Sequence, residues 1–394
     1  LGDARGAEAA AFDDGSWRKL DLPHDWSIEG PFNQTNSSGG EGGYVTTGVG
    51  WYRQPFATPD SLAGRKAVVE FDGVYMNSDV WLNGHHLGNW PFGYTSFHYD
   101  LTPFLSPAGK ANVLAVRVDN SKQPNSRWYS GSGIYRHVWL TGTDPLHVAH
   151  WGTYVTTPKV STNSATVRVR TRVQNEFKEK RAVTLVSQLL DANGQVVATA
   201  NANKTIRAGG EFEFDQSIEL AKPQLWSPGN PYLYRVRSLV QSAGQPADDY
   251  STPIGIRELR YDVDCGFLLN GQPVKMLGMC VHHDGGSVGA AVPEGVWERR
   301  LQLLKDMGCN ALRMSHNPPA PELLDLCDRM GFLVMDEAFD QWLISKTRED
   351  YARYFKDWSI KDLTAMLHRD RNHPSVVMWS VGNEIREQTR TNGA

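Results

Sequence analysis

SVVMWSVGNE, residues 375–384, is an apolar run that ends abruptly in polar residues. Its apolar side chains follow neither a period of two nor one of 3.6, a pattern typical of a strand buried on both faces in a parallel sheet. Pro374 ends the segment before the run, and Gly382 permits a kink at its far end. Glu384 would then lie at the carboxyl end of a buried parallel strand, where (β/α) barrels gather their functional side chains.

Strands and helices alternate in the residues that lead up to this run. Pro293 and Pro321 are expected to open helices, and Gly308 and Gly331 to close them, because proline favours the first helical turn and glycine the residue after the last. We predict strands at 274–281, 310–315, 332–338 and 375–384, and a longer helix at 351–371. This βα repetition predicts a parallel sheet.

Residues 257–394 contain four βα units, whereas a (β/α)8 TIM barrel has eight strands and typically about 250 residues. Four parallel strands cannot close a barrel, and they leave an open edge. We therefore predict that this region is the first half of a TIM barrel. We also expect the sequence to be the N-terminal part of a longer polypeptide.

Residues 1–144 consist of short alternating segments separated by turn signals. Segment 75–82 alternates apolar and polar side chains and leads into Asn83-Gly84, a strong hairpin signal. Segment 112–118 alternates again, and glycine and proline recur between the segments. Many short strands with frequent turns predict an all-β jelly-roll sandwich.

Residues 145–256 repeat this pattern after a linker at 143–146. Valine and threonine alternate with arginine over 167–173, which predicts a half-buried strand whose arginines form a solvated outer face. Asn193-Gly194 marks a further turn. This length and pattern predict an immunoglobulin-like β-sandwich, and the absence of a cysteine pair excludes an antibody-type domain.

Composition excludes two classes of partner. The net charge of the 394 residues is −4 and no long basic run occurs, so we predict no nucleic-acid partner. No apolar run approaches the roughly 20 residues that a membrane helix needs. The four cysteines have neither disulfide nor metal-ligand spacing, and we predict that all are buried apolar side chains. They are Cys265, Cys280, Cys309 and Cys327.

Polar residues follow each of the four predicted parallel strands. They are His282, His283 and Asp284; Arg313, Ser315, His316 and Asn317; Asp336, Glu337 and Asp340; and Asn383 and Glu384. Because the carboxyl ends of parallel strands share one edge, we expect a single mouth that forms an active site. A zinc site of His282, His316 and Glu337 is an alternative, but no His-Glu-x-x-His or Cys-x-x-Cys spacing supports it.

Motifs along the whole chain resemble glycoside hydrolase family 2, and most closely its bacterial β-galactosidases. The matching stretches are LPHDW (22–26), GVGWYR (48–53), FDGV (71–74), VWLNG (80–84), GSGIYR (131–136), LWSPGNPYLY (225–234), GFLLNG (266–271), HHD (282–284), RMSHNPP (313–319), MDEA (335–338) and RNHPSV (371–376), which runs into Gly382-Asn383-Glu384. So many motifs in the same order are specific for the family, and less specific for the sugar that is cleaved.

The resemblance implies hydrolysis of terminal β-glycosides with retention, by two carboxylates. Glu384 would be the general acid/base, which protonates the leaving oxygen and later takes a proton from water. Asn383 would hold the sugar 2-hydroxyl, and His282 and His316 would bind substrate. Arg313 would position the nucleophile, a second glutamate that belongs on a later strand and does not occur in this sequence.

The first domain of these enzymes also reaches the active site. Asp25, Arg127 and Trp128 are our candidates for sugar contacts, and Asp25 could equally cap a turn. Magnesium-dependent members of the family carry Glu-x-His after Asp-Glu-Ala-Asn, whereas residues 336–342 read DEAFDQW. That departure argues against the magnesium site of those members, and the sequence gives no firm basis for predicting a cofactor or for assigning metal ligands.

Three functions remain open on the sequence. The first is a retaining enzyme that releases terminal non-reducing β-D-galactose, of which this chain alone would be inactive because it has one of the two carboxylates. The second is a β-glucuronidase or β-mannosidase of the same family. The third is a non-catalytic carbohydrate-binding fragment. We expect the full-length protein to be a homo-oligomer. Its location stays open between the bacterial cytoplasm and the periplasm or the outside of the cell.

Overall fold

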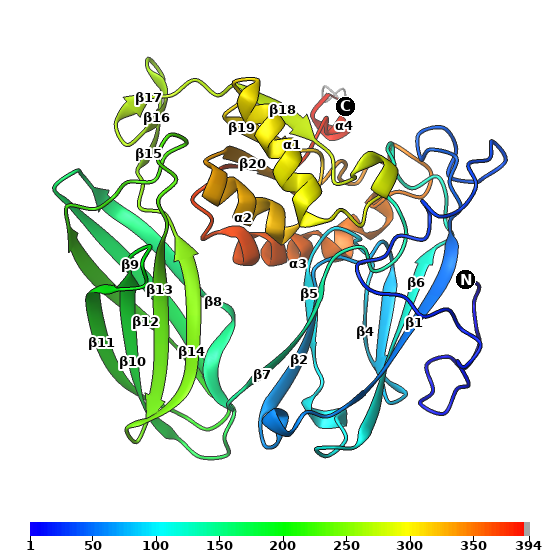
Figure 1. Ribbon diagram of the computed structural model, residues 1–394, viewed down its shortest axis with the longest axis horizontal. Coiled ribbons are helices and arrows are strands. Elements are labelled where there is room, and N and C mark those ends of the chain that lie inside the picture. Colours follow the sequence, from blue (N-terminus) through cyan, green and yellow to red (C-terminus); the bar gives the residue numbers. More distant parts are fainter. Residues whose placement is uncertain (390–394) are drawn as a thin grey trace, which may run out of the picture.

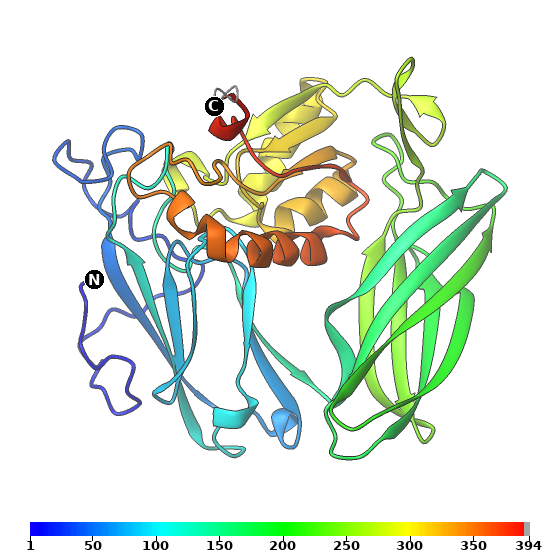
Figure 2. The same ribbon diagram turned by 180° about the vertical axis from the view of Figure 1, so that it is seen from behind.

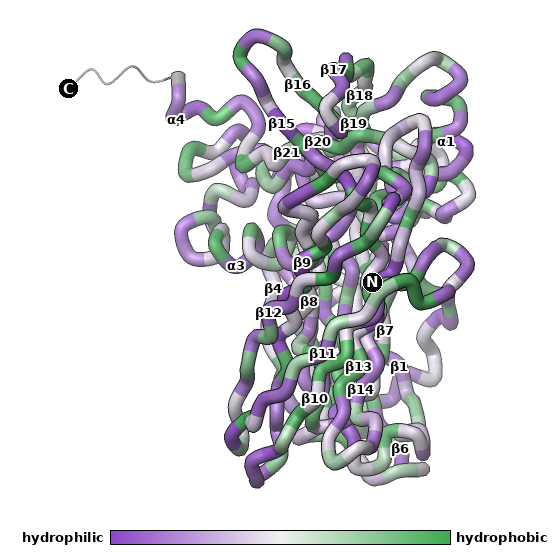
Figure 3. The backbone as a smooth tube through the Cα atoms, turned by 90° about the vertical axis from the view of Figure 1, so that its left-hand side faces the viewer, coloured by the Kyte–Doolittle hydropathy of each residue, from purple (hydrophilic) through white to green (hydrophobic). Residues whose placement is uncertain are grey.

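The computed structural model describes residues 1–389. Two β-sandwiches stand side by side, and a βα region lies across one end of them (Figures 1 and 2). Hydrophobic and hydrophilic stretches are interspersed along both sandwiches (Figure 3). Burial alternates from one residue to the next in strands such as Lys66–Phe71, Ser164–Asn175 and Gly210–Ala221. Each sandwich therefore presents one face of its sheets to a core and the other to solvent. No helix in the described part of the chain is long and apolar enough to cross a membrane.

The first sandwich pairs a four-stranded sheet, β1-β6-β3-β4, with a three-stranded sheet, β5-β2-β7. Its strands are β1 (Gly48–Ala57), β2 (Lys66–Phe71), β3 (Ser78–Leu82), β4 (His85–Trp90), β5 (Phe97–Asp100), β6 (Ala111–Asn120) and β7 (Val138–Thr143). The hairpin predicted at Asn83-Gly84 joins β3 to β4, with positive φ at both residues. The strand before it starts at Ser78 and not at Tyr75, because Asn77 has a φ of 47° and interrupts the extended backbone.

The second sandwich is immunoglobulin-like, with sheets β12-β9-β8 and β11-β10-β13-β14. Its strands are β8 (Leu146–Val160), β9 (Ser164–Asn175), β10 (Arg181–Leu190), β11 (Val196–Ile206), β12 (Gly210–Ala221), β13 (Tyr234–Ser242) and β14 (Gln245–Ile254). The arginines of β9 face solvent as predicted, where they pair with acidic residues of β12: Arg168 with Asp215, Arg170 with Glu213, and Arg172 with Glu211.

A small antiparallel sheet leads into the βα region. It consists of β15 (Leu259–Asp262), β16 (Gly266–Leu269) and β17 (Gln272–Pro273). The βα region follows as β18 (Gly278–Val281), α1 (Glu294–Asp306), β19 (Ala311–Met314), α2 (Pro321–Met330), β20 (Leu333–Glu337), α3 (Ala352–Asp370), β21 (Val376–Ser380) and α4 (Arg386–Thr389). The four strands pair in parallel and in chain order, which is the partial TIM barrel expected from the sequence.

Three sequence-based expectations for this region are wrong in detail. The first parallel strand starts at Gly278 and not at 274, because Val274 bonds back to Phe267 in the preceding hairpin. The run 375–384 is not buried on both faces, since the Trp379 side chain is 41% exposed. Among the described residues β21 pairs only with β20, so it is an edge strand.

The third error concerns the cysteines. Cys327 is buried in the core beneath α2, as predicted, but Cys309 is only partly buried. Cys265 and Cys280 are exposed. Cys265 lies in the turn between β15 and β16, and Cys280 lies on β18, the other edge strand of the described parallel sheet. Both positions lack a packing layer in this part of the protein.

Buried hydrogen bonds fix the βα region to both sandwiches. Arg136 of the first sandwich is buried and donates to the carbonyl of Pro318 at 3.0 Å. Trp90 donates from Nε1 to Asp362 of α3 at 3.0 Å. From the second sandwich, Trp226 donates to the carbonyl of Asp328 in α2 at 3.0 Å. The bonds of Trp90 and Trp226 thus reach helices of the βα region, whereas the Arg136 bond reaches the loop that follows the carboxyl end of β19.

Candidate active site

The structure brings the strand-end clusters together at one edge of the parallel sheet. We call this edge, with the side chains of Arg313, Glu337, Asn383 and Glu384, the mouth. Arg313 is the third residue of β19, and Glu337 is the last residue of β20. Asn383 and Glu384 follow the end of β21 by three and four residues. A parallel sheet places all carboxyl ends on one side, so side chains from strands far apart in sequence meet here.

Glu337 is the centre of this arrangement. Its side chain is fully buried, and its carboxylate accepts hydrogen bonds from Arg313 Nη2 at 2.8 Å, His316 Nδ1 at 2.6 Å and Ser380 Oγ at 2.6 Å. Burial alone would raise the pKa of Glu337, but the bonds from His316, Ser380 and Arg313 outweigh it and lower that pKa below its usual value. Glu337 is therefore an ionised anchor that orients its donors.

Asp336, the neighbour of Glu337, points to the other side of the strand. It is also fully buried, but neither of its carboxyl oxygens has a hydrogen-bond donor. Burial, with the nearby charge of Asp370, raises the pKa of Asp336 well above its usual value. Of the two adjacent carboxyls, only Glu337 serves the mouth, because successive side chains of a strand alternate between faces.

Asn383 is buried and held at both ends of its amide. Its Oδ1 accepts a bond from Arg313 Nη2 at 2.9 Å, and its Nδ2 donates to Asp340 Oδ1 at 2.8 Å. Its backbone N–H donates to the carbonyl of Phe339 at 2.9 Å. Each amide end can form a second bond, so Asn383 can still contact a ligand hydroxyl from a fixed position.

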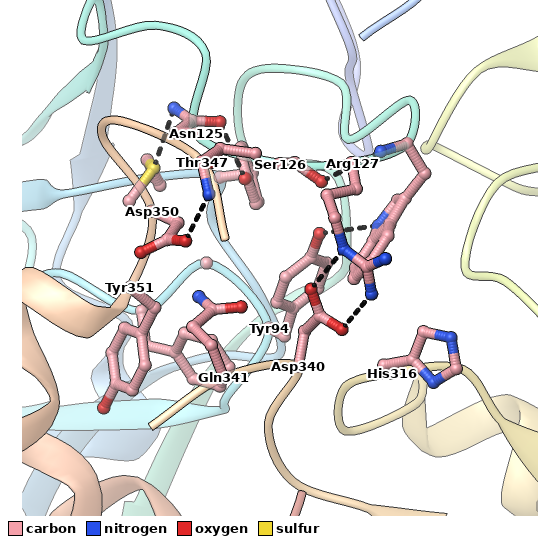
Figure 4. Close-up of a pocket in the computed structure, with 15 residues that line it drawn as sticks. Tyr94, Asn125, Ser126, Arg127, His316, Asp340, Gln341, Thr347, Asp350 and Tyr351 are labelled. Carbon is pink, nitrogen blue, oxygen red and sulfur yellow. Dashed lines mark hydrogen bonds and ion pairs between the residues drawn. The ribbon is translucent and has the colours of Figure 1, made fainter. Parts of the chain in front are cut away.

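Asp340 binds two cationic side chains where the βα region meets the first domain, a contact zone that we call the seam. Arg127 donates to it through two nitrogens, at 2.6 and 3.0 Å (Figure 4). Lys346 Nζ lies 3.0 Å from Asp340 Oδ1. Burial opposes ionisation of Asp340, but the bonds from Arg127, Asn383 and Lys346 lower its pKa below its usual value. A charged loop residue of the first domain is thus tied into the mouth.

Glu384 presents its carboxylate to solvent beside these cations. Its side chain is 68% exposed, with Oε2 at 3.3 Å from Arg127 Nη2 and 3.7 Å from Lys346 Nζ. Its backbone has a φ of 45°, in the left-handed region that few residues other than glycine adopt. The strand end therefore turns sharply and directs Glu384 outward while Asn383 stays buried.

Aromatic rings form one side of the mouth. The ring of Trp128 contacts His282 and His316 edge to face, with centroids 5.0 and 5.6 Å apart. Trp128 Nε1 donates to Tyr94 Oη at 3.1 Å, which fixes the indole. Burial, followed by the charge of His316, lowers the pKa of His282. Arg127 and Trp128 thus lie at the mouth, and the sugar contacts that the family resemblance implies for them stay a prediction.

A narrow cavity of about 30 Å³ continues from this mouth into the seam between the domains. Figure 4 shows the Arg127 guanidinium beside the Asp340 carboxylate, with His316 on one side of this pair and Asn125 and Tyr351 on the other. The cavity is lined by both the first domain and the loop between β20 and α3. The first domain therefore contributes part of the wall of the site.

Asp25 differs from the other predicted site residues. It is 3% exposed, and its two carboxylate oxygens accept four hydrogen bonds. The donors are the backbone N–H groups of Ser27, Ser132 and Ala290 and the hydroxyl of Tyr129. These bonds use all the acceptor positions of the carboxylate. The geometry favours the turn-capping alternative over a sugar contact.

Sequence reasoning gave too little weight to three residues. Glu337 and Asp340 were recognised in a strand-end cluster but not chosen as site residues, although the structure makes each a centre of hydrogen bonding. Lys346 was not recognised at all. The Asp-Glu pair at a strand end was the available signal for Glu337, whereas a lysine in an irregular loop carries no such signal.

The residues of the mouth do not fit a bound magnesium or zinc ion. At the stretch where magnesium-dependent relatives carry ligands, Phe339 is buried against the rings of Phe92 and Tyr351. His316 Nδ1 is already bonded to Glu337. The groups of potential metal ligands in the described residues lie elsewhere, at Asp72, His137 and Glu322 and at Asp325, Asp328 and His373.

Three family models of glycoside hydrolase family 2 match the chain in succession. The sugar binding domain matches residues 43–144, the central domain 147–257, and the TIM barrel domain 263–392. The β-galactosidase BoGH2A of Bacteroides ovatus is 54% identical over 98% of the chain, and a putative β-glucuronidase of Formosa agariphila is 40% identical over 94%.

Solved structures agree with these similarities. A family 2 glycosyl hydrolase of Bacteroides cellulosilyticus superposes with a TM-score of 0.96 at 43% identity, over 98% of this chain and 50% of its own. A β-glucuronidase of Bacteroides uniformis gives a TM-score of 0.85 at 31% identity, over 98% of this chain and 45% of its own. The chain spans 46% of the Bacteroides ovatus relative and 35% of the Formosa agariphila relative. With motifs, domain order and strand-end geometry in agreement, the chain belongs to glycoside hydrolase family 2.

Proposed function

We propose that the protein containing this chain is a retaining β-galactosidase that releases terminal non-reducing β-D-galactose. The observation that carries the proposal is the position of Glu384: an exposed carboxylate at the mouth, next to a buried and doubly held Asn383. The 54% identity with a β-galactosidase supports galactose as the sugar.

In this proposal Glu384 acts as general acid and then as general base. It donates its proton to the glycosidic oxygen as that bond to the anomeric carbon breaks and a carboxylate nucleophile bonds to the same carbon. The resulting Glu384 carboxylate then takes a proton from water, whose oxygen displaces the nucleophile. Asn383 is the candidate partner of the sugar 2-hydroxyl, and His282, His316 and Trp128 are candidates for the wall that contacts the ring.

The nucleophile in this mechanism is not Glu337. Three donors surround the Glu337 carboxylate, and its side chain is fully buried. We assign Glu337 the role of orienting Arg313 and His316, and the nucleophile to a glutamate outside this sequence. Because this assignment leaves residues 1–394 without the nucleophile, we infer that these residues alone do not turn over substrate.

A β-glucuronidase is the second candidate. It is supported by the 40% identical relative, a putative β-glucuronidase, and by the fit to a β-glucuronidase structure. Both candidates share the roles given to Glu384 and Asn383. Comparing the full-length protein on nitrophenyl β-galactoside and nitrophenyl β-glucuronide distinguishes them, and faster hydrolysis of the glucuronide would refute the galactosidase assignment.

The acid/base role is tested with Glu384→Gln in the full-length protein. Proton donation matters most for a poor leaving group, so kcat/KM for phenyl β-galactoside should fall by about 100- to 10,000-fold. The kcat/KM for 2,4-dinitrophenyl β-galactoside should fall much less, because 2,4-dinitrophenolate leaves without being protonated. Glu298→Gln, at an exposed position on α1, is the matched control. Equal losses on the two substrates would contradict the assignment.

A further inference from the structure

Lys346 is a buried cation that the mechanism above leaves without a role. It lies in the loop between β20 and α3, and its side chain is 4% exposed. Its ammonium donates to the backbone carbonyl of Asn383 at 2.8 Å and to Asp340 Oδ1 at 3.0 Å. It also lies 3.7 Å from Glu384 Oε2. A buried ammonium needs such partners, because removing it from water is costly.

The loop that carries Lys346 is itself fixed. Asp350 is buried and accepts the backbone N–H of Lys346 at 2.7 Å and that of Thr347 at 2.8 Å. Its other oxygen accepts the N–H of Ala352 at 3.1 Å, where α3 begins. The position of the lysine is therefore set by the start of a long helix and does not depend on a bound ligand.

Lys346 and Arg127 act on Glu384 from two elements. Arg127 comes from the first domain and Lys346 from the barrel, and Asp340 bonds to both of them. Lys346 alone also bonds to the peptide that precedes Glu384, through the Asn383 carbonyl. That peptide leads into the positive φ of Glu384, a conformation that persists only where its surroundings impose it.

We propose that Lys346 is a positioning residue for general acid/base catalysis. It fixes the Asn383–Glu384 peptide and draws the Glu384 carboxylate toward the leaving-group side of the mouth. The proposal rests on the acid/base role of Glu384. A misplaced acid loses proton transfer before it loses sugar binding, and small displacements of a reacting group can lower rates by about 100-fold.

A positioning role and a purely structural role predict different patterns of loss. If Lys346 only supported the fold, its removal would reduce the folded fraction and lower kcat/KM by the same factor on every substrate. If it acts through Glu384, the loss falls on substrates whose leaving group needs a proton. The ratio of kcat/KM for two substrates does not depend on the active fraction, so it separates the two cases.

The test uses the full-length protein with Lys346→Met, Glu384→Gln and the double variant. We expect Lys346→Met to lower kcat/KM for phenyl β-galactoside by about 10- to 100-fold, and for 2,4-dinitrophenyl β-galactoside by less than about threefold. In the Glu384→Gln background the same substitution should have no further effect on phenyl β-galactoside. Lys356→Met, at an exposed position on α3, should leave both values unchanged.

Two results would overturn the positioning role while leaving the proposed function intact. One is a selective loss in Glu384→Gln with an equal loss on both substrates in Lys346→Met. The other is a double variant whose loss is the product of the two single losses. An equal loss on both substrates in Glu384→Gln itself would instead refute the acid/base assignment, and the positioning role would fall with it.

Discussion

Two neighbouring carboxyls, Asp336 and Glu337, have opposite ionisation behaviour although both are fully buried. Glu337 has three donors and a lowered pKa, whereas Asp336 has none and a raised pKa. Burial and the charge of Asp370 therefore raise the pKa of Asp336, whereas the bonds from His316, Ser380 and Arg313 outweigh burial at Glu337. The sequence predicted a polar strand end, but it could not say which of the two carboxyls faces the mouth.

His373 provides a test of residue-scale electrostatics away from the mouth. Burial disfavours its charged form, but the charge and hydrogen bond of Asp328, with Nδ1–Oδ2 at 2.6 Å, outweigh this and raise the pKa of His373 to about 9. An unfolded histidine has a pKa near 6.5, so the folded state binds the proton more tightly. The stabilisation is full below about pH 6.5 and is lost as pH rises through about 9.

We predict that His373→Gln lowers the free energy of unfolding by a few kcal/mol at pH 6, and that this difference from the unsubstituted protein shrinks toward pH 10. Urea unfolding of the two proteins between pH 6 and pH 10 measures it. His85→Gln, at an exposed position, should give a small difference with no such trend. A His373→Gln difference that stays constant across this range would contradict the prediction.

At the scale of elements, the sequence predicted regular segments well and irregular ones poorly. Pro321 opens α2, and Gly331 follows its last turn with a φ of 74°, as expected from their chemistry. By contrast, the loop between β20 and α3 has no periodicity, and the bond from Lys346 to Asn383 joins residues 37 positions apart. Such a contact depends on tertiary packing, which no local pattern encodes.

Gly308 and Gly331, which follow α1 and α2, allow the cost of backbone strain to be measured apart from the cost of a steric contact. Both have positive φ, but a Cβ at Gly331 would meet the Pro228 carbonyl oxygen at 2.5 Å, whereas one at Gly308 would meet nothing within 4 Å. Gly308→Ala should therefore cost only the left-handed strain, about 1–2 kcal/mol. Gly331→Ala should lower the free energy of unfolding by about 1–3 kcal/mol more than Gly308→Ala does, because the second sandwich and α2 must move apart. Chemical denaturation of both variants gives the comparison, and equal costs would mean that this contact relaxes freely.

At the scale of the whole molecule, the order of three domain types followed from patterns that are local in sequence. Strand alternation, turn signals and βα repetition each need only a short window. The seams between domains could not be read in this way, since bonds such as Arg136 to Pro318 and Trp90 to Asp362 join residues far apart in the chain. The site is built at one of these seams, which explains why Arg127 was recognised only through resemblance.

Asp25 tests whether this seam is structural or part of substrate recognition. Its carboxylate joins Ser132 of the first domain to Ala290 of the barrel, at 2.9 and 2.8 Å. Asp25→Ala leaves buried donors without an acceptor, so the free energy of unfolding should fall by about 2–4 kcal/mol. Because the carboxylate has no free acceptor position, KM for nitrophenyl β-galactoside should change less than about twofold in the folded full-length protein.

Calorimetry and steady-state kinetics on the same preparation check both parts of this prediction. Asp21→Ala, at an exposed position four residues earlier, should alter neither quantity. If Asp25→Ala instead raised KM tenfold at unchanged stability, the residue would contact the sugar, as the resemblance to family 2 first implied. The four bonds described here would then have to rearrange when substrate binds. A fall in stability with KM preserved would mean that the first domain shapes the mouth through Arg127 and Trp128, while Asp25 holds the seam that brings them there.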